Sequence, residues 1–265
     1  MGTWEKLAQD PAALSEQTGT RADHNATPVQ SFVQLEMDNA VALVKIVNTD
    51  VMAIKSVVYG TGMLTPAIQT NAETMIVGWV PGKWEKKWEG PEAPLPWLKA
   101  LIMRKIALKK WMDDALADKL LNDVPLRLNE LLHPGTFLNA VRQQTARVSK
   151  QPLDSLKMVS CFDKKLIEKF PLYIRVQGLF MQGALFEESG LQPAGPDSNE
   201  IITVKDAYIA YVPPTTKFPY EQDTYVMVPI YYNTLRERLL TELAVPMTGR
   251  VSDWIQAGVA LFLDQ

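Results

Sequence analysis

The stretch KQPLDSLKMVSCF, residues 150–162, marks a change in the hydrophobic pattern of this sequence. Before it, apolar residues recur every three to four positions, which is the spacing of helices that bury one face. After Pro152, apolar and polar residues alternate in short runs that are rich in β-branched and aromatic residues and are separated by Gly, Pro, Asn and Asp. The sequence therefore predicts an α+β protein, with a helical part first and a β part after it.

The helical part is expected to begin with a long helix at Pro28–Tyr59. Thr27 can cap that helix, Pro28 suits its first position, and no breaker interrupts it before Gly60. By the same criteria, further helices are predicted at about 65–78, from Pro96 onward and at about 136–150. Residues 1–27 are expected to be an N-terminal segment, with a short helix at 4–14 and a mobile linker at 17–26. Residues 28–155 are predicted to form a helical subdomain.

Residues 156–265 are predicted to form a small antiparallel β-barrel. Its strands are expected at Leu156–Phe162, Leu172–Phe186 (with breaks at Gly178 and Gly183), Ala207–Val212, Thr224–Tyr232, Leu239–Val245 and Ile255–Leu263. Six short strands in about 110 residues favour a closed barrel, because closure removes exposed sheet edges.

Composition excludes several classes of protein. With 47% hydrophobic and 22% charged residues, the sequence has the composition of a folded globular protein. Residues 1–155 carry 17 basic and 17 acidic residues and the remainder carries 10 and 13, so neither part has the positive charge that nucleic-acid binding needs. No apolar run is long enough to span a membrane, and no signal peptide is apparent. One cysteine, Cys161, is typical of a cytoplasmic protein.

Few side chains are available for catalysis. The only histidines are His24 and His133, which is too few for a histidine-based nucleophile system or metal centre. The stretch GWVPGK at 78–83 has one residue too few between its glycines for a phosphate loop and lacks the following hydroxyl. Trp79, Trp84, Trp88 and Trp97 could form a ligand box, but more often such residues fill a core. We therefore expect no enzymatic activity, no cofactor and no metal.

Four stretches carry a resemblance to a known family. They are LHPGTFLNAVRQQTAR at 132–147, VQGLFMQGA at 176–184, VPIYYNTLR at 228–236 and WIQAGVALFL at 254–263. In this order they resemble the C-terminal domains of dynein heavy chains. Within that family, FLNA at 137–140 and the final stretch that begins at Trp254 resemble the intraflagellar-transport type.

The resemblance implies a role without a catalytic site. The domain would lie against the motor's ring of ATPase modules on the same polypeptide and modulate a minus-end-directed microtubule motor. Its expected partners are that ring and the dynein complex, with no nucleic acid and no membrane, and the isolated domain is expected to be a monomer. The expected location is the cytoplasm and the cytoskeleton of the cilium or flagellum. Three alternatives stay open: an enzyme without a histidine site, an oligonucleotide- or ligand-binding β-barrel, and a protein-interaction adaptor independent of any motor.

The long helix offers a candidate docking surface. Its apolar residues form two stripes, and one of them contains Phe32, Leu35, Leu43, Ile46 and Val57. Both stripes can pack within the domain, which is the usual fate of such residues. Alternatively, the second stripe is partly bare and docks on the ring, since an exposed apolar strip commonly marks an interaction surface.

Overall fold

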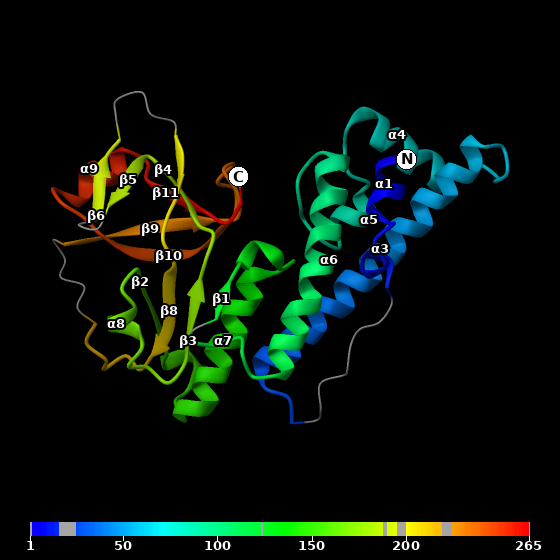
Figure 1. Cartoon of the computed structure of the whole chain (residues 1–265). Helices are drawn as coiled ribbons and strands as arrows, with labels where there is room; N and C mark the ends of the chain where they lie inside the picture. The colour runs from blue at the N-terminus through cyan, green and yellow to red at the C-terminus, as the bar shows by residue number, and fades with distance from the viewer. Residues whose placement is uncertain are drawn as a thin grey trace. The chain divides into compact units, whose positions relative to one another are not determined.

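The structure, a computed structural model, describes residues 2–15, 25–122, 124–187, 190–194, 200–218 and 224–264. The linker predicted at 17–26 lies mostly outside these residues, as does His24. The protein divides into two compact units (Figure 1). The helical unit comprises 1–26, 30–113 and 130–132, and the sheet unit comprises 27–29, 114–129 and 133–265. Helix α7 therefore belongs with the strands. No helix of the described residues is long and apolar enough to cross a membrane.

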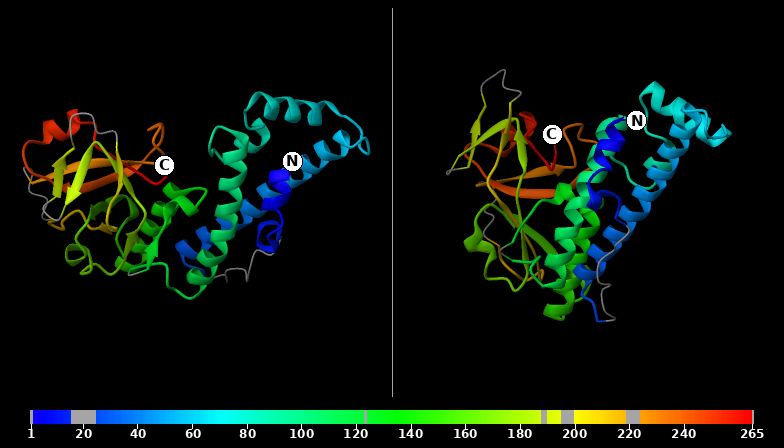
Figure 2. Two further views of the ribbon diagram at one scale, coloured as in Figure 1. Left: turned by 45° about the horizontal axis from the view of Figure 1, so that its top comes forward. Right: turned by 45° about the vertical axis from the view of Figure 1, so that its right-hand side comes forward.

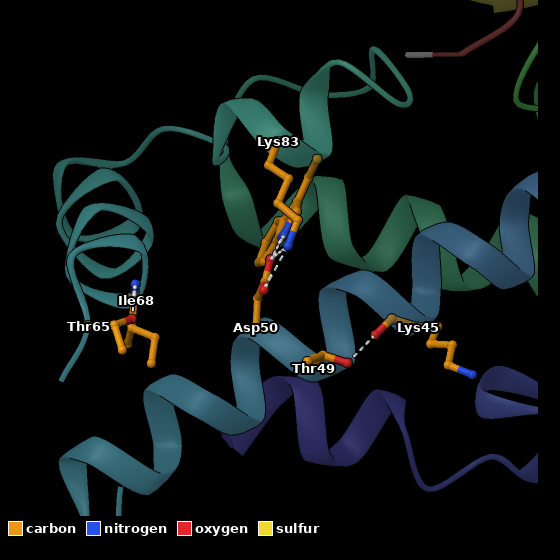
Figure 3. Close-up of polar contacts among 7 residues, drawn as sticks. Lys45, Thr49, Asp50, Thr65, Ile68 and Lys83 are labelled. Carbon is orange, nitrogen blue, oxygen red and sulfur yellow. Dashed lines mark hydrogen bonds and ion pairs between the residues drawn. The ribbon is translucent and has the colours of Figure 1, made fainter. Parts of the chain in front are cut away.

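The helical unit contains six helices of very different length among its described residues. They are α1 (Gly2–Leu7), α2 (Pro11–Leu14), α3 (Pro28–Val58), α4 (Pro66–Val77), α5 (Gly82–Glu85) and α6 (Pro94–Leu116). The ends of α4 illustrate how the sequence sets such boundaries. Thr65 Oγ1 accepts a hydrogen bond from the backbone amide of Ile68 (Figure 3). At the other end, Gly78 ends the helix in the left-handed region at φ +97°.

Tryptophans form the centre of the helical unit. The rings of Trp84 and Trp88 each pack on Trp97, with centroids 5.7 and 5.3 Å away, and all three side chains are buried. Asp50 of α3 accepts a hydrogen bond of 2.8 Å from Trp84 Nε1 and pairs with Lys83 Nζ at 3.1 Å (Figure 3). These three indoles are therefore core residues, because each is packed and its surroundings are closed to solvent.

The sheet unit combines short strands with three helices among its described residues. The helices are α7 (Pro134–Ser149), α8 (Lys164–Ile167) and α9 (Val251–Gln256), and 3-10 turns lie at Leu128–Glu130 and Leu153–Ser155. The strands are β1 (Pro125–Leu126), β2 (Lys157–Cys161), β3 (Tyr173–Val176), β4 (Phe180–Gln182), β5 (Ala184–Glu187), β6 (Gly190–Pro193), β7 (Ile201–Thr203), β8 (Ala207–Val212), β9 (Tyr225–Tyr231), β10 (Leu239–Pro246) and β11 (Ala260–Phe262).

The described strands form two mixed sheets and a hairpin. One sheet has the order β1-β3-β8-β2, the other β10-β9-β11-β4-β7, and β5 pairs with β6. Most neighbours are antiparallel, but β1 runs parallel to β3 and β11 runs parallel to β9. Every residue of β8 is buried, and α7 and α8 both contact this strand. The core of the sheet unit therefore lies around β8, as expected for a central strand covered by helices.

The prediction of a closed antiparallel barrel is wrong, although the α+β class is confirmed. The last strand, β11, lies between β9 and β4 inside one sheet and does not close a ring of strands. Where β2 and β10 approach each other, the hydroxyl of Ser160 bridges them instead of a backbone ladder. Ser160 Oγ donates to the carbonyl of Glu242 at 3.1 Å and accepts from the amide of Ala244 at 3.3 Å.

The strand predicted at Ile255–Leu263 is also partly wrong. Its first residues belong to α9, and only Ala260–Phe262 form a strand. Buried Trp254 anchors α9 by donating from Nε1 to the carbonyl of Thr248 at 3.0 Å. By contrast, the predicted breaks at Gly178 and Gly183 are confirmed. Both have positive φ, and they separate β3, β4 and β5.

Candidate interaction surface

The residues considered for catalysis are dispersed. His133 directly precedes α7, and its side chain makes no capping hydrogen bond to that helix. Gly78 ends α4 and Gly82 starts α5, so this glycine pair connects two helices, whereas a phosphate loop connects a strand to a helix. The ammonium group of Lys83 is paired with Asp50. Within the described ranges, no three His, Cys, Asp or Glu residues are grouped so that they could hold a metal ion.

The predicted docking stripe on α3 is divided by burial. Phe32 and Leu43 are buried, and Ile46 and Val57 are partly buried. Leu35 is the member with a largely exposed side chain, at 55% exposure. Docking through this set stays a prediction, and Leu35 is the residue on which it now depends most.

A larger apolar surface lies on and beside α4. Figures 1 and 2 show this helix, in cyan and teal, spanning from the C-terminal end of α3 toward α5 and the start of α6. We call it the α4 surface, and it consists of seven large apolar residues that are each more than half exposed: Val58, Tyr59, Met63, Leu64, Ile76, Val77 and Trp79.

Helix α4 itself buries no residue, although every residue of it is described. Ile76 and Val77 are 83% and 72% exposed. The helix is held locally by its Thr65 cap, by its glycine end and by the hydrogen bond from Gln69 Nε2 to Glu73 Oε1 at 2.8 Å. A helix of 12 residues is marginal in water when it stands alone, and most helical stability in proteins comes from packing of an apolar face.

Helix α4 carries little charge, although the Lys55 ammonium lies 5.8 Å from the centre of the Tyr59 ring on the α4 surface. Glu73 is the one charged residue in the sequence of α4. Depletion of charged residues together with enrichment in tryptophan, tyrosine and methionine distinguishes the centre of a protein–protein interface from the rest of a surface. Contiguous exposed apolar surface commonly marks a binding site. The arrangement is therefore suited to association with another apolar protein surface.

Sequence reasoning on the long helix missed this surface, although a signal was available. Met75, Ile76 and Val77 are consecutive, and successive helical residues point about 100° apart. A 12-residue amphipathic helix cannot direct all three toward one core, so at least one of them had to face outward or a second partner.

Comparison with known proteins identifies the family. The family model for the C-terminal domain of the dynein heavy chain matches residues 3–263. The cytoplasmic dynein 2 heavy chain 1 of Homo sapiens is 36% identical over 263 residues, covering 99% of this sequence, and that of Chlamydomonas reinhardtii is 30% identical over 279 residues, covering 98%. The dynein alpha chain of the flagellar outer arm of Chlamydomonas reinhardtii is 28% identical over 178 residues, covering 63% of this sequence and 4% of that protein.

The match to the cytoplasmic dynein 2 heavy chains covers 6% of their own length. The match to the family model extends through both units of this protein, from the first helix to the last strand. The resemblance to this family is therefore confirmed, and the protein belongs to the family of C-terminal domains of dynein heavy chains.

Proposed function

We propose that this protein is a non-catalytic regulatory and scaffolding module of a minus-end-directed microtubule motor. It docks on the ATPase ring of the same heavy chain and modulates the motion of that ring, in the setting of intraflagellar retrograde transport. ATP hydrolysis belongs to other parts of the heavy chain. The module acts in the cytoplasm and in the cilium or flagellum, and the isolated module is monomeric.

The α4 surface carries this proposal. A helix that buries no residue and leaves Ile76 and Val77 largely exposed is expected when another protein surface covers it. Membership of a family named for its place in the dynein heavy chain supplies the nearest candidate for that cover. The names of the relatives, cytoplasmic dynein 2 and a flagellar outer-arm dynein, support the proposed location.

The test compares motility and catalysis in one full-length heavy chain. Ile76→Gln, Val77→Gln and Trp79→Gln, combined in one variant, make the α4 surface polar without removing a buried side chain. We expect the run length and stall force on microtubules to change, while ATP hydrolysis by the motor persists. Met227→Gln, on a half-exposed position of β9, is the matched control. Motility equal to that of the control would contradict regulation through this surface.

Catalytic independence has its own measurement. Isothermal titration calorimetry of the 265-residue protein with ATP is expected to give no saturable heat, because Lys83 is already paired with Asp50 and the surrounding backbone joins two helices. Saturable ATP binding that Lys83→Ala abolishes would contradict the proposal.

A further inference from the structure

Next to α4, the helical unit contains an apolar groove of about 450 Å³. Four helices line it: α1 with Trp4, α3 with Val51, Ile54 and Val58, α4 with Ala72, Met75 and Ile76, and α6 with Pro94, Leu95 and Leu98. All ten lining residues are apolar. The volume is in the range of sites that receive a ligand or several large side chains.

Contacts between α1 and α3 build one side of the groove. Trp4 is 2% exposed, and its Nε1 donates to Asn48 Oδ1 on α3 at 3.0 Å. The next residue, Glu5, pairs with Lys55, two turns further along the same face of α3. Val51 lies between these two anchors and is buried. These contacts hold α1 against α3, so Trp4 forms part of the groove within this protein itself.

The rim of the groove is open and continuous with the α4 surface. Val58, Ile76 and Leu95 line the groove and are also 67%, 83% and 44% exposed. Val58 and Ile76 are members of the α4 surface as well. An occupant can therefore enter from solvent and remain in contact with the exposed side chains outside.

The lining favours a protein segment over a small amphiphile. Sites for small molecules usually add a few placed polar groups that fix the ligand's head group, and this lining consists of apolar residues. An acyl group in the groove would also leave Met63, Leu64, Val77 and Trp79 in water. An amphipathic helix, which presents apolar residues at positions i, i+3, i+4 and i+7, would fill the groove and cover the rim together.

We propose that this groove receives the apolar edge of a helix from the motor portion of the same heavy chain. The inference rests on the proposed function and adds to it the contact through which docking occurs. Because the matched region is 6% of the length of the curated relatives, such a heavy chain has ample length outside this domain to supply the helix. The contact is apolar, so its strength is set by buried area and depends little on salt.

Photocrosslinking in the full-length heavy chain tests the contact. Benzoylphenylalanine is placed at position 95 on the exposed rim of the groove, at position 77 outside it, or at position 227 in the sheet unit as the control. We expect positions 95 and 77 to crosslink to one helical segment of the motor portion and position 227 to leave that segment unlabelled.

The other outcomes separate the two proposals. Crosslinking of the motor portion from position 77 but not from position 95 would overturn the groove contact and leave ring docking in place. No crosslink to the motor portion from either position would overturn both. Saturable binding of oleate to the 265-residue protein, abolished by Ala72→Trp, would assign the groove to an acyl ligand and overturn the helix contact.

A groove-filling variant gives a second readout. Ala72→Trp is expected to occupy the space that the helix needs and to reduce crosslinking from position 77 at least tenfold. Ala67→Trp adds the same side chain at an exposed position of α4 that does not line the groove, and it is expected to leave that crosslink unchanged. Circular dichroism of each variant should show the same helix content as the parent protein. Equal crosslinking in Ala72→Trp and Ala67→Trp would contradict insertion into the groove.

Discussion

At the scale of single residues, the hydroxyl of Ser160 joins two sheets. It lies between β2 and β10, is 1% exposed, and satisfies both the Glu242 carbonyl and the Ala244 amide. In Ser160→Ala, both backbone groups would lose this partner in a site from which water is excluded. Leaving a buried polar group unsatisfied costs about 1–3 kcal/mol.

We therefore expect Ser160→Ala to lower the free energy of unfolding by about 1–3 kcal/mol, measured by urea denaturation. Ser155→Ala is the matched control, because the Ser155 hydroxyl bonds only a local carbonyl, that of Pro152, at an exposed site. The control should change stability by less than about 0.5 kcal/mol. Equal urea denaturation midpoints for the two variants would show that the contact between β2 and β10 does not depend on the Ser160 hydroxyl.

Cys161 provides a second test at this scale, through its thiol chemistry. Burial raises the pKa of this thiol from 9.0 to about 11. The reactive species is the thiolate, so at pH 8 Ellman's reagent should modify Cys161 only when the protein unfolds. Rapid labelling of the native protein at pH 8, with no change in circular dichroism, would contradict the burial of this side chain.

The same pKa shift predicts how stability depends on pH. Between pH 9 and 11 the unfolded state loses the Cys161 proton while the folded state keeps it, so folding becomes less favourable as pH rises. Below pH 9 both states hold the proton and this contribution is constant. Cys161→Ala should therefore show a smaller loss of stability between pH 9 and 11 than the parent protein. Tyr211, whose pKa burial raises to about 12, contributes equally to both proteins and cancels in the comparison.

At the scale of elements, α4 depends on its ends because no buried side chain holds it. Gly78 has φ +97°, a conformation that a residue with a Cβ adopts at a cost of about 1 kcal/mol. We expect Gly78→Ala to accelerate hydrogen exchange of the α4 amides roughly fivefold, measured by mass spectrometry. Gly82→Ala is the control, since Gly82 has no positive φ and a Cβ there would meet no atom within 4 Å. Faster exchange of the α4 amides in both variants would show that the effect comes from α5 and not from the Gly78 end of α4.

Most helices could be predicted because their boundaries depend on neighbouring residues. Thr65, Pro66 and Gly78 act within a few residues of the helix ends, and α4 begins and ends where they indicate. The strand predicted from Ile255 failed for a different reason. Its alternating apolar residues fit a strand, but Ile255 belongs to the short helix that holds buried Trp254, so alternation alone did not decide the local structure.

Sheet closure and exposure could not be predicted from local patterns. The barrel prediction required β11 to pair at an edge, and pairing between distant strands leaves no periodic trace in the sequence. Similarly, Leu35 and Leu43 belong to one predicted stripe, yet one is 55% and the other 2% exposed. Their difference depends on which element packs over each turn of α3, which is a property of the tertiary structure.

At the scale of the whole molecule, the two units can be monitored separately by tryptophan fluorescence. Six of the seven tryptophans lie in the helical unit, and Trp254 alone lies in the sheet unit. Fluorescence therefore reports chiefly on the helical unit, whereas far-ultraviolet circular dichroism also reports on the sheets. A change confined to one unit should separate these two signals.

Deletion of residues 257–265 is such a change, because β11 lies between β9 and β4. Leu261 is paired with both Ile230 and Met181, so its loss divides the five-stranded sheet and exposes two new edges. Leu261 and Phe262 are both fully buried, and a single large-to-small change at such a site costs about 2–5 kcal/mol. The loss of unfolding free energy caused by removing the whole strand should exceed the stability of a typical domain, which is about 5–15 kcal/mol.

We expect the truncated protein to lose the cooperative melt of its sheets and to keep a fluorescence transition from the helical unit. Ile255→Gln, at an exposed position of α9, should melt like the parent. A truncated protein that kept the parent's cooperative melt in circular dichroism would show that the sheet unit does not need its central strand.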